Sequence, residues 1–125
     1  MINLISIEYD LSIYQLNTTQ EIPSQFHDST FFSITKTDDE ISIVSNLKLE
    51  IPGAKVNHGW KAFKVKGILD FSLTGLINDI TYPLKINNIS VFIISTYNTD
   101  YILVKKEKYL ETVEILNKTN NIRII

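Results

Sequence analysis

The stretch WKAFKVKGILDFSLTGLINDITYPL, residues 60–84, decides the fold because its periodicity changes from that of a strand to that of a helix. Over residues 60–65, apolar side chains are interspersed with lysines, which predicts a strand. Beyond Gly67, apolar residues recur at helical spacing, which predicts a helix. The apolar positions of this helix are Leu73, Leu76, Ile77, Ile80 and Leu84.

Both ends of the predicted helix carry signals of their own. Asp70 or Ser72 can cap its start, because a short polar side chain there accepts a hydrogen bond from a free backbone N–H. Pro83 has no backbone N–H to donate, so we expect it to kink or end the helix near Tyr82.

The residues that follow continue the alternation of strands and helices. A strongly apolar strand is predicted over residues 90–95, in the centre of the sheet, followed by a turn at 97–100 and a returning strand over 101–104. A second amphipathic helix is predicted over residues 107–118, and residues 122–125 can close the sheet as a last short strand.

The element order from residue 60 onward is therefore β-α-β-β-α-β. This order predicts an α+β, ferredoxin-like fold, in which an antiparallel sheet carries both helices on one face. Right-handed crossovers make the first and third strands central neighbours.

In the second helix we expect Leu110 on the apolar face and a favourable pair between Glu114 and Lys118, four residues apart.

The first third of the chain is rich in predicted strands. Residues 5–16 alternate imperfectly between apolar and polar, which predicts one long half-buried strand. Residues 18–29 are polar and contain a proline, which predicts a loop or one short helical turn. Residues 31–35 and 41–44 predict a hairpin. This part is similar to a curtailed version of the same unit, without a sequence repeat.

Length and composition fit one domain, or two very small ones that share a core. Of the 125 residues, 44% are hydrophobic and 21% are charged, which is ordinary globular usage and argues against disorder. We place the division between a β-rich N-terminal unit, residues 1–56, and the βαββαβ domain, residues 57–125.

Composition also excludes several classes of protein. The chain has no cysteine, which excludes disulfides and thiolate sites and suits a reducing cytosol. The first ten residues lack the basic start of a signal peptide, and no apolar run is long enough to cross a bilayer. The net charge is −2 and the lysines form no one-sided basic face. We therefore expect a cytoplasmic protein that binds neither nucleic acid nor a membrane.

The residues form no catalytic constellation. His27 and His58 are the only histidines, and neither has a second ligand at metal spacing. Motifs for phosphate loops, dinucleotide binding and nucleophile elbows are absent, and Arg123 is the only arginine. We therefore expect a protein that is not an enzyme and that needs neither a metal nor a cofactor.

Two segments are candidates for a binding site. Residues 67–75 lead from a strand into the start of a helix, where free N–H groups can hold a carboxylate. Residues 95–100 gather short hydroxyls and a carboxylate where one strand ends and the next begins. Each segment alone is also explained by ordinary capping and turn chemistry. In the βαββ order they can face one pocket, and their opposite polarities would suit a free amino acid.

The motifs that carry a family resemblance are Trp60-x-x-Phe63-x-Val65-x-Gly67, Leu69-Asp70-Phe71-Ser72-Leu73-Thr74-Gly75 and Ser95-Thr96-Tyr97-x-Thr99-Asp100-Tyr101-Ile102-Leu103-Val104. They resemble the ACT-domain family, in particular small bacterial ACT proteins related to the arginine-sensing CASTOR proteins and to aspartate kinase regulatory domains. Residues 31–35 and 40–45 resemble the N-terminal part of the same small proteins. The resemblance therefore covers nearly the whole chain.

The resemblance implies an ACT domain preceded by a partial ACT-like unit. It implies that the loop before the helix would hold the backbone of an amino acid, through Asp70, Phe71, Ser72, Leu73, Thr74 and Gly75. In the second segment it points to Ser95, Thr96 and Asp100, and Asp100 has the position whose aspartate meets the guanidinium in the CASTOR branch. This chain is shorter than a CASTOR protein, so a site formed within one CASTOR chain would form here between units or subunits.

Two functions from different classes follow. The leading hypothesis is a non-catalytic regulatory protein, a homodimer that senses a small molecule such as an amino acid and acts on a regulated enzyme. The alternative is a protein–protein interaction module that dimerises through its exposed sheet edges and binds no ligand.

Overall fold

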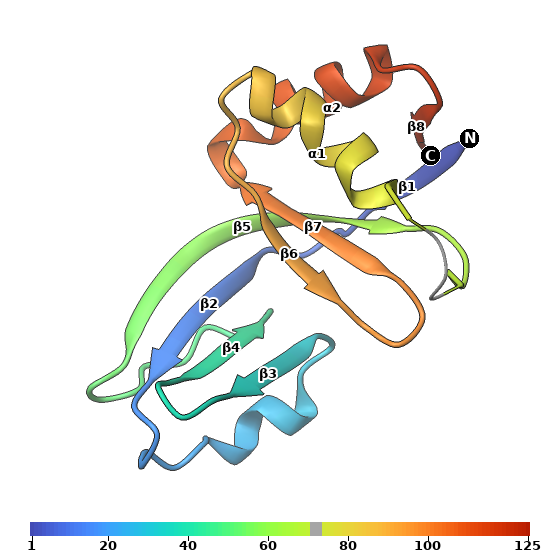
Figure 1. Cartoon of the computed structure of the whole chain (residues 1–125). Helices are drawn as coiled ribbons and strands as arrows, with labels where there is room; N and C mark the ends of the chain where they lie inside the picture. The colour runs from blue at the N-terminus through green and yellow to red at the C-terminus, as the bar shows by residue number, and fades with distance from the viewer. Residues whose placement is uncertain (71–73) are drawn as a thin grey trace. The chain divides into compact units, whose positions relative to one another are not determined.

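The computed structural model describes residues 1–70 and 74–125, and Figure 1 shows the course of the chain. The described residues form two compact units. One unit comprises Met1–Glu8 with Trp60–Ile125, and the other is Tyr9–Gly59. The predicted division gave residues 1–56 to one unit, whereas the structure groups the first eight residues with the C-terminal part of the chain.

The larger unit contains the predicted βαββαβ elements and one additional strand. Its elements are β1 (Ile2–Ser6), the second half of β5 (Lys55–Val65), α1 (Leu76–Ile86), β6 (Phe92–Ser95), β7 (Asp100–Lys105), a 3-10 turn (Lys106–Lys108), α2 (Tyr109–Lys118) and β8 (Ile122–Ile124). Helices α1 and α2 lie over one face of its sheet (Figure 1), as the ferredoxin-like prediction requires. The predicted fold class is confirmed.

Strand order in this unit is β6-β7-β5-β1-β8. The first and third strands of the predicted unit, β5 and β7, are antiparallel neighbours, with Phe63 opposite Ile102, so this prediction is confirmed. The prediction that residues 90–95 form a central strand is wrong. Among the described strands β6 pairs only with β7, because in this topology the second strand lies outside the third.

The additional strand is β1, which lies between β5 and β8. It runs antiparallel to β5, with Leu4 opposite Val65, and parallel to β8, with Leu4 opposite Ile124. The predicted single strand over residues 5–16 is therefore wrong: β1 ends at Ser6 and β2 begins at Leu11. The apolar alternation continues across the bend between them, so periodicity alone does not reveal it.

The smaller unit is a sheet with a short helical turn. It contains β2 (Leu11–Leu16), a 3-10 helix (Ser24–Asp28), β3 (Phe32–Lys36), β4 (Ile41–Ser45) and the first residues of β5, in the sheet order β3-β4-β2-β5. The predicted hairpin of β3 and β4 is confirmed. Thr37 stabilises its turn, since its Oγ1 accepts bonds from the N–H groups of Asp39 and Glu40. The core of this unit consists of Tyr14, Leu16, Phe26, Ile41 and Ile43.

The core of the larger unit lies between its sheet and the two helices. Its buried members come from all these elements: Leu4, Phe63, Val65, Ile80, Leu84, Ile89, Ile102, Val104, Leu116 and Ile122.

In α2 the predicted pair is present, with Lys118 Nζ 2.8 Å from Glu114 Oε1. Leu110, however, is 79% exposed, so the prediction that it faces the core is wrong. Thr112 and Leu116 are the buried residues of α2.

Helix α1 differs from its prediction at both ends. It begins after Gly75, which has a φ of 81°, so Asp70 does not cap it, and Ser72 lies outside the described residues. It continues through Pro83 to Ile86, so of the two predicted alternatives, a kink or an end near Tyr82, the end is wrong. Pro83 and Leu84 are buried, and we attribute the extra turn to this packing, which offsets the lost backbone bond.

The end of α1 is closed by the backbone. Asn88 has a φ of 58°, and its N–H bonds to the carbonyl of Lys85 while that of Ile89 bonds to the carbonyl of Leu84. This is the Schellman arrangement, and it satisfies carbonyls that a helix end leaves open. None of the described helices is long and apolar enough to cross a membrane.

We predict that Leu84→Ala destabilises the protein by about 2–5 kcal/mol, because Leu84 is fully buried against the sheet and its truncation leaves a cavity. Urea unfolding followed by circular dichroism measures the change. Ile86→Ala on the same helix is the control, since Ile86 is 60% exposed and should change stability by less than about 0.5 kcal/mol. Equal effects of the two substitutions would contradict the described packing of α1.

Candidate functional site

The two segments that the sequence indicates line one hollow of the larger unit. This hollow has a volume of about 390 Å³ and is lined by residues 69–70, 75–78 and 95–100, and we call it the α1 hollow. Its walls are the described residues of the connection that leads into α1, the first turn of α1, and the turn between β6 and β7. The expectation that these segments face one pocket is therefore correct for the described residues.

Two hydrogen bonds hold the walls of the α1 hollow together. The buried hydroxyl of Thr99 donates to the carbonyl of Val65 at 2.7 Å, which ties the β6–β7 turn to the end of β5. The backbone N–H of Leu69 donates to the carbonyl of Asn98, also at 2.7 Å. Because the donors and acceptors come from both segments, the geometry of the hollow is fixed by the fold.

The turn between β6 and β7 is stabilised internally. The N–H of Thr96 bonds to the carbonyl of Thr99 at 2.8 Å, and the N–H of Thr99 bonds to the hydroxyl of Thr96 at 3.2 Å. Next to this turn, Ser95 and Asp100 are opposite each other in the strand register. The Ser95 hydroxyl donates to Asp100 Oδ1 at 2.5 Å, which helps to orient this carboxylate of the lining.

The start of α1 contributes backbone N–H groups to the hollow. Gly75 accepts the first helical bond, from the N–H of Asp79 at 2.9 Å. The N–H groups of residues 76–78 belong to the first turn, where helix geometry provides no backbone acceptor. The N-cap, Gly75, has no side chain that could cap this helix. The first turn therefore offers donors and the positive end of the helix dipole to an anion.

The opposite polarity is present in the same hollow. Asp70 and Asp100 are the charged residues among the described residues that line it, and no lysine, arginine or histidine is among them. The described walls thus combine a helix start that favours a carboxylate with two carboxylates that favour a cation. No group of histidines and acidic residues that could hold a metal ion occurs in the described part of the chain.

The predicted site residues fall into three groups. Asp70, Gly75, Ser95, Thr96 and Asp100 line the hollow. Thr74 is exposed and is not among the lining residues, and Phe71, Ser72 and Leu73 lie outside the described residues.

Residues 76–78 line the hollow although the sequence motifs did not predict them as site residues. A helix start placed at Gly75, and not at Asp70 or Ser72, would have identified them, because the free N–H groups belong to the first turn.

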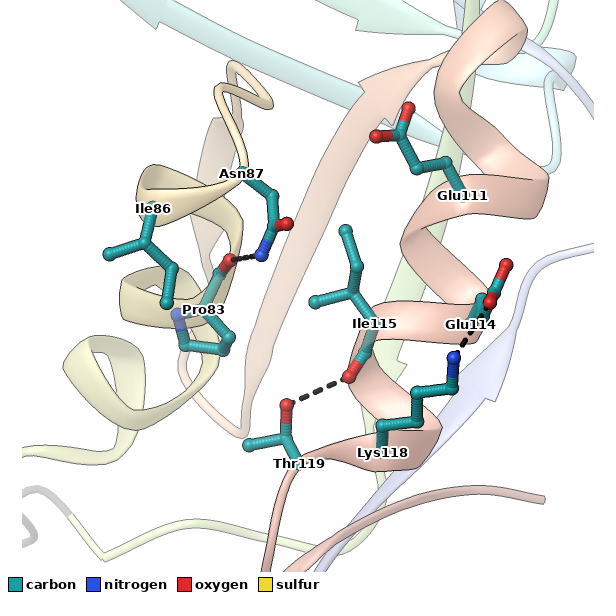
Figure 2. A pocket seen from close by; sticks show the side chains of 8 residues that line it. All are labelled: Pro83, Ile86, Asn87, Glu111, Glu114, Ile115, Lys118 and Thr119. Atoms are coloured by element: carbon teal, nitrogen blue, oxygen red, sulfur yellow. Dashed lines mark hydrogen bonds and ion pairs between the residues drawn. The ribbon is translucent and has the colours of Figure 1, made fainter.

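A second hollow lies between the outer sides of α1 and α2 (Figure 2). Several of its polar groups are bonded within their own helices: Asn87 Nδ2 donates to the carbonyl of Pro83, and Thr119 Oγ1 donates to that of Ile115. Lys118 is likewise bonded to Glu114. This bond is the main cause that lowers the pKa of Glu114, and the positive charge of Lys118 is the second. Several polar side chains of this second hollow are therefore bonded within their own helix.

Comparison with known proteins identifies the family. The family model of the ACT domain matches residues 55–118, more than half of the chain. The chain belongs to the ACT-domain family. A second family model, of an N-terminal domain, matches residues 10–53. The family resemblance seen in the sequence motifs is confirmed.

Individual relatives agree with this assignment. The human protein CASTOR3P is 36% identical to this ACT-domain protein over 89 residues, which cover 61% of this chain and 55% of that protein. The chain therefore spans about half the length of this relative. Protein Atu0741 from Agobacterium tumefaciens is 30% identical, with a TM-score of 0.84 and coverage of 99% of this chain and 93% of that chain.

One solved structure shares the fold at low identity. The regulatory subunit of aspartate kinase from Thermus thermophilus is 8% identical, with a TM-score of 0.62 over 90% of this chain and 94% of that chain. This likeness extends the shared fold to a protein of very different sequence.

We predict that Thr99→Val destabilises the protein by about 1–3 kcal/mol, because it removes the buried hydroxyl that bonds to the carbonyl of Val65. Chemical denaturation measures the loss. Thr35→Val is the control, since Thr35 is exposed on β3 and should be nearly neutral. If Thr99→Val is as stable as the parent, this bond does not hold the walls of the hollow together.

We also predict that Lys118→Met raises the pKa of Glu114 back toward its ordinary value, because both causes that lower it come from Lys118. A carboxyl NMR titration measures this pKa. Because the pKa of Glu114 is lower in the folded protein than in the unfolded chain, this group stabilises the fold at pH values above its unfolded pKa. The contribution is lost as the pH falls through the folded pKa. Lys85→Met, on α1, is the control and should leave the pKa of Glu114 unchanged.

Proposed function

We propose that this ACT-domain protein is a non-catalytic regulator that binds a free amino acid in the α1 hollow. One observation carries the proposal: the first turn of α1 and the carboxylates of Asp70 and Asp100 lie in the same hollow. An amino acid has a carboxylate and an ammonium group a short distance apart. The hollow combines one region that suits each group.

The ligand would be oriented by these two regions. The carboxylate of the ligand accepts hydrogen bonds from the N–H groups of residues 76–78 at the start of α1, and the ammonium group of the ligand faces the carboxylate of Asp100. Ser95 supports this arrangement because its hydroxyl holds one oxygen of the Asp100 carboxylate in place. Gly75 places no side chain at the helix start, and apart from its two chain neighbours no described residue has a heavy atom within 4 Å of where its Cβ would be.

Regulation would follow from assembly. We propose a homodimer in the cytosol in which ligand binding favours one arrangement of subunits or of a regulated enzyme. A ligand shifts such an equilibrium only by its differential affinity for the two states, typically about 1–3 kcal/mol. The membership in the ACT-domain family and the likeness to a regulatory subunit of aspartate kinase support this role.

We predict that a thermal-shift screen of the purified protein against the twenty amino acids identifies at least one ligand. A ligand at about 100 times its Kd should stabilise the folded state by about 2.7 kcal/mol, which is readily visible in a small domain. Asp100→Asn should weaken binding of that ligand about tenfold, because it removes the charge of a charge-assisted hydrogen bond. Calorimetric titration measures the affinity.

The control substitution is Asp39→Asn, in the exposed turn between β3 and β4, which should bind the ligand as the parent does. Equal affinity of the parent and of Asp100→Asn would contradict the proposed site. A protein that no amino acid stabilises would contradict the proposed ligand, and it would favour the interaction module, whose partner could be sought by co-purification.

A further inference from the structure

The smaller unit has a hollow of its own that the proposed function does not use. Its volume is about 510 Å³, and we call it the N-terminal hollow. Most of its lining is apolar and comes from the segment before β5 and from β5 itself: Leu49, Ile51, Pro52, Ala54 and Val56. Ligand sites typically have volumes of about 300–1,000 Å³, an apolar lining and a few polar groups.

One wall of this hollow is held in place by Tyr14 of β2. The Tyr14 hydroxyl donates to the carbonyl of Leu47 at 2.7 Å and accepts a bond from the N–H of Leu49 at 2.9 Å. Further along the segment, Gln20 Nε2 donates to the carbonyl of Pro52 at 2.8 Å. The apolar wall is therefore fixed to the strand without a ligand, which lowers the entropy cost of binding.

His58 is a polar residue of the lining, and contacts with Ser12 and Tyr14 help to orient its ring. Its Nδ1 is 2.7 Å from the hydroxyl of Ser12, which is 2% exposed. The ring also lies edge-on to Tyr14, with the ring centroids 6.3 Å apart.

The charge of the hollow comes from Glu50. Its side chain is exposed, and it forms no ion pair with any of the described residues. Beside it, Val56 leaves 47% of its surface open although it belongs to a strand. A ligand that covers Val56 and its apolar neighbours removes apolar surface from water, and a cationic group on that ligand can pair with Glu50.

We propose that the N-terminal hollow binds a small organic amine, that is, an apolar or aromatic body with one ammonium group. The ammonium group pairs with the carboxylate of Glu50, and the body lies on Leu49, Ile51 and Val56, next to Tyr14 and His58. The site is separate from the α1 hollow, because all its lining residues belong to the unit Tyr9–Gly59.

The test is a titration of the full ¹⁵N-labelled chain with phenethylammonium chloride, followed by amide NMR shifts. We expect saturable shifts at Leu49, Glu50, Ile51 and Val56, and binding about tenfold weaker for Glu50→Gln. Glu21→Gln, at an exposed glutamate outside the hollow, is the matched control and should bind as the parent does. The neutral analogue 2-phenylethanol should bind about as weakly as phenethylammonium binds to Glu50→Gln.

A second variant tests the apolar part of the site. Ala54→Trp fills the hollow and should abolish the shifts while the circular dichroism spectrum stays that of the parent. Asp100→Asn, which tests the α1 hollow, should leave phenethylammonium binding unchanged. Absence of saturable shifts, shifts centred on residues 95–100, or equal binding by Glu50→Gln and the parent would each overturn the proposal.

Discussion

The pairing of β5 along both of its edges is the constraint on which the larger unit depends. Its second half bonds to β7 on one side and to β1 on the other, so it is the central strand of this sheet. Phe63 and Val65 are thereby placed in the core beneath the helices. The carbonyl of Val65, at the end of this strand, is also the acceptor that fixes Thr99. One strand therefore positions both the core and the β6–β7 turn.

The candidate site follows from this arrangement more than from any single side chain. Once the β6–β7 turn is tied to the end of β5, Asp100 and Ser95 lie beside the connection that leads into α1. The polar character of the hollow has two sources of different kinds, a helix start and carboxylates. The contribution of the helix depends on where α1 begins, and the position of the Asp100 carboxylate depends on the register of β6 and β7. Both are therefore set by the course of the backbone.

Much of this could be predicted from the sequence, because strong periodicity and turn residues determine it. The helices, the hairpin of β3 and β4 and the ferredoxin-like order all follow from local patterns. The site was predicted as two segments, and the described residues bring them together. The predictions that failed depend on packing. Pro83 stays within a helix because it is buried, and Leu110 is exposed although its position fits an apolar face. The place of β1 could not be predicted, since its partners are distant in sequence and its pattern merges with that of β2.

The position of β1 has a consequence for how the chain acquires its structure. This strand pairs with β5 and β8, which follow it by more than 50 residues, while the residues of the smaller unit are continuous in sequence. Contacts between distant residues are slow to form because a long loop must close first. During synthesis on the ribosome, Tyr9–Gly59 can therefore complete its sheet early. Strand β1 can pair with β5 soon after Gly59 has emerged, but its other edge stays unpaired until β8, near the end of the larger unit, has emerged.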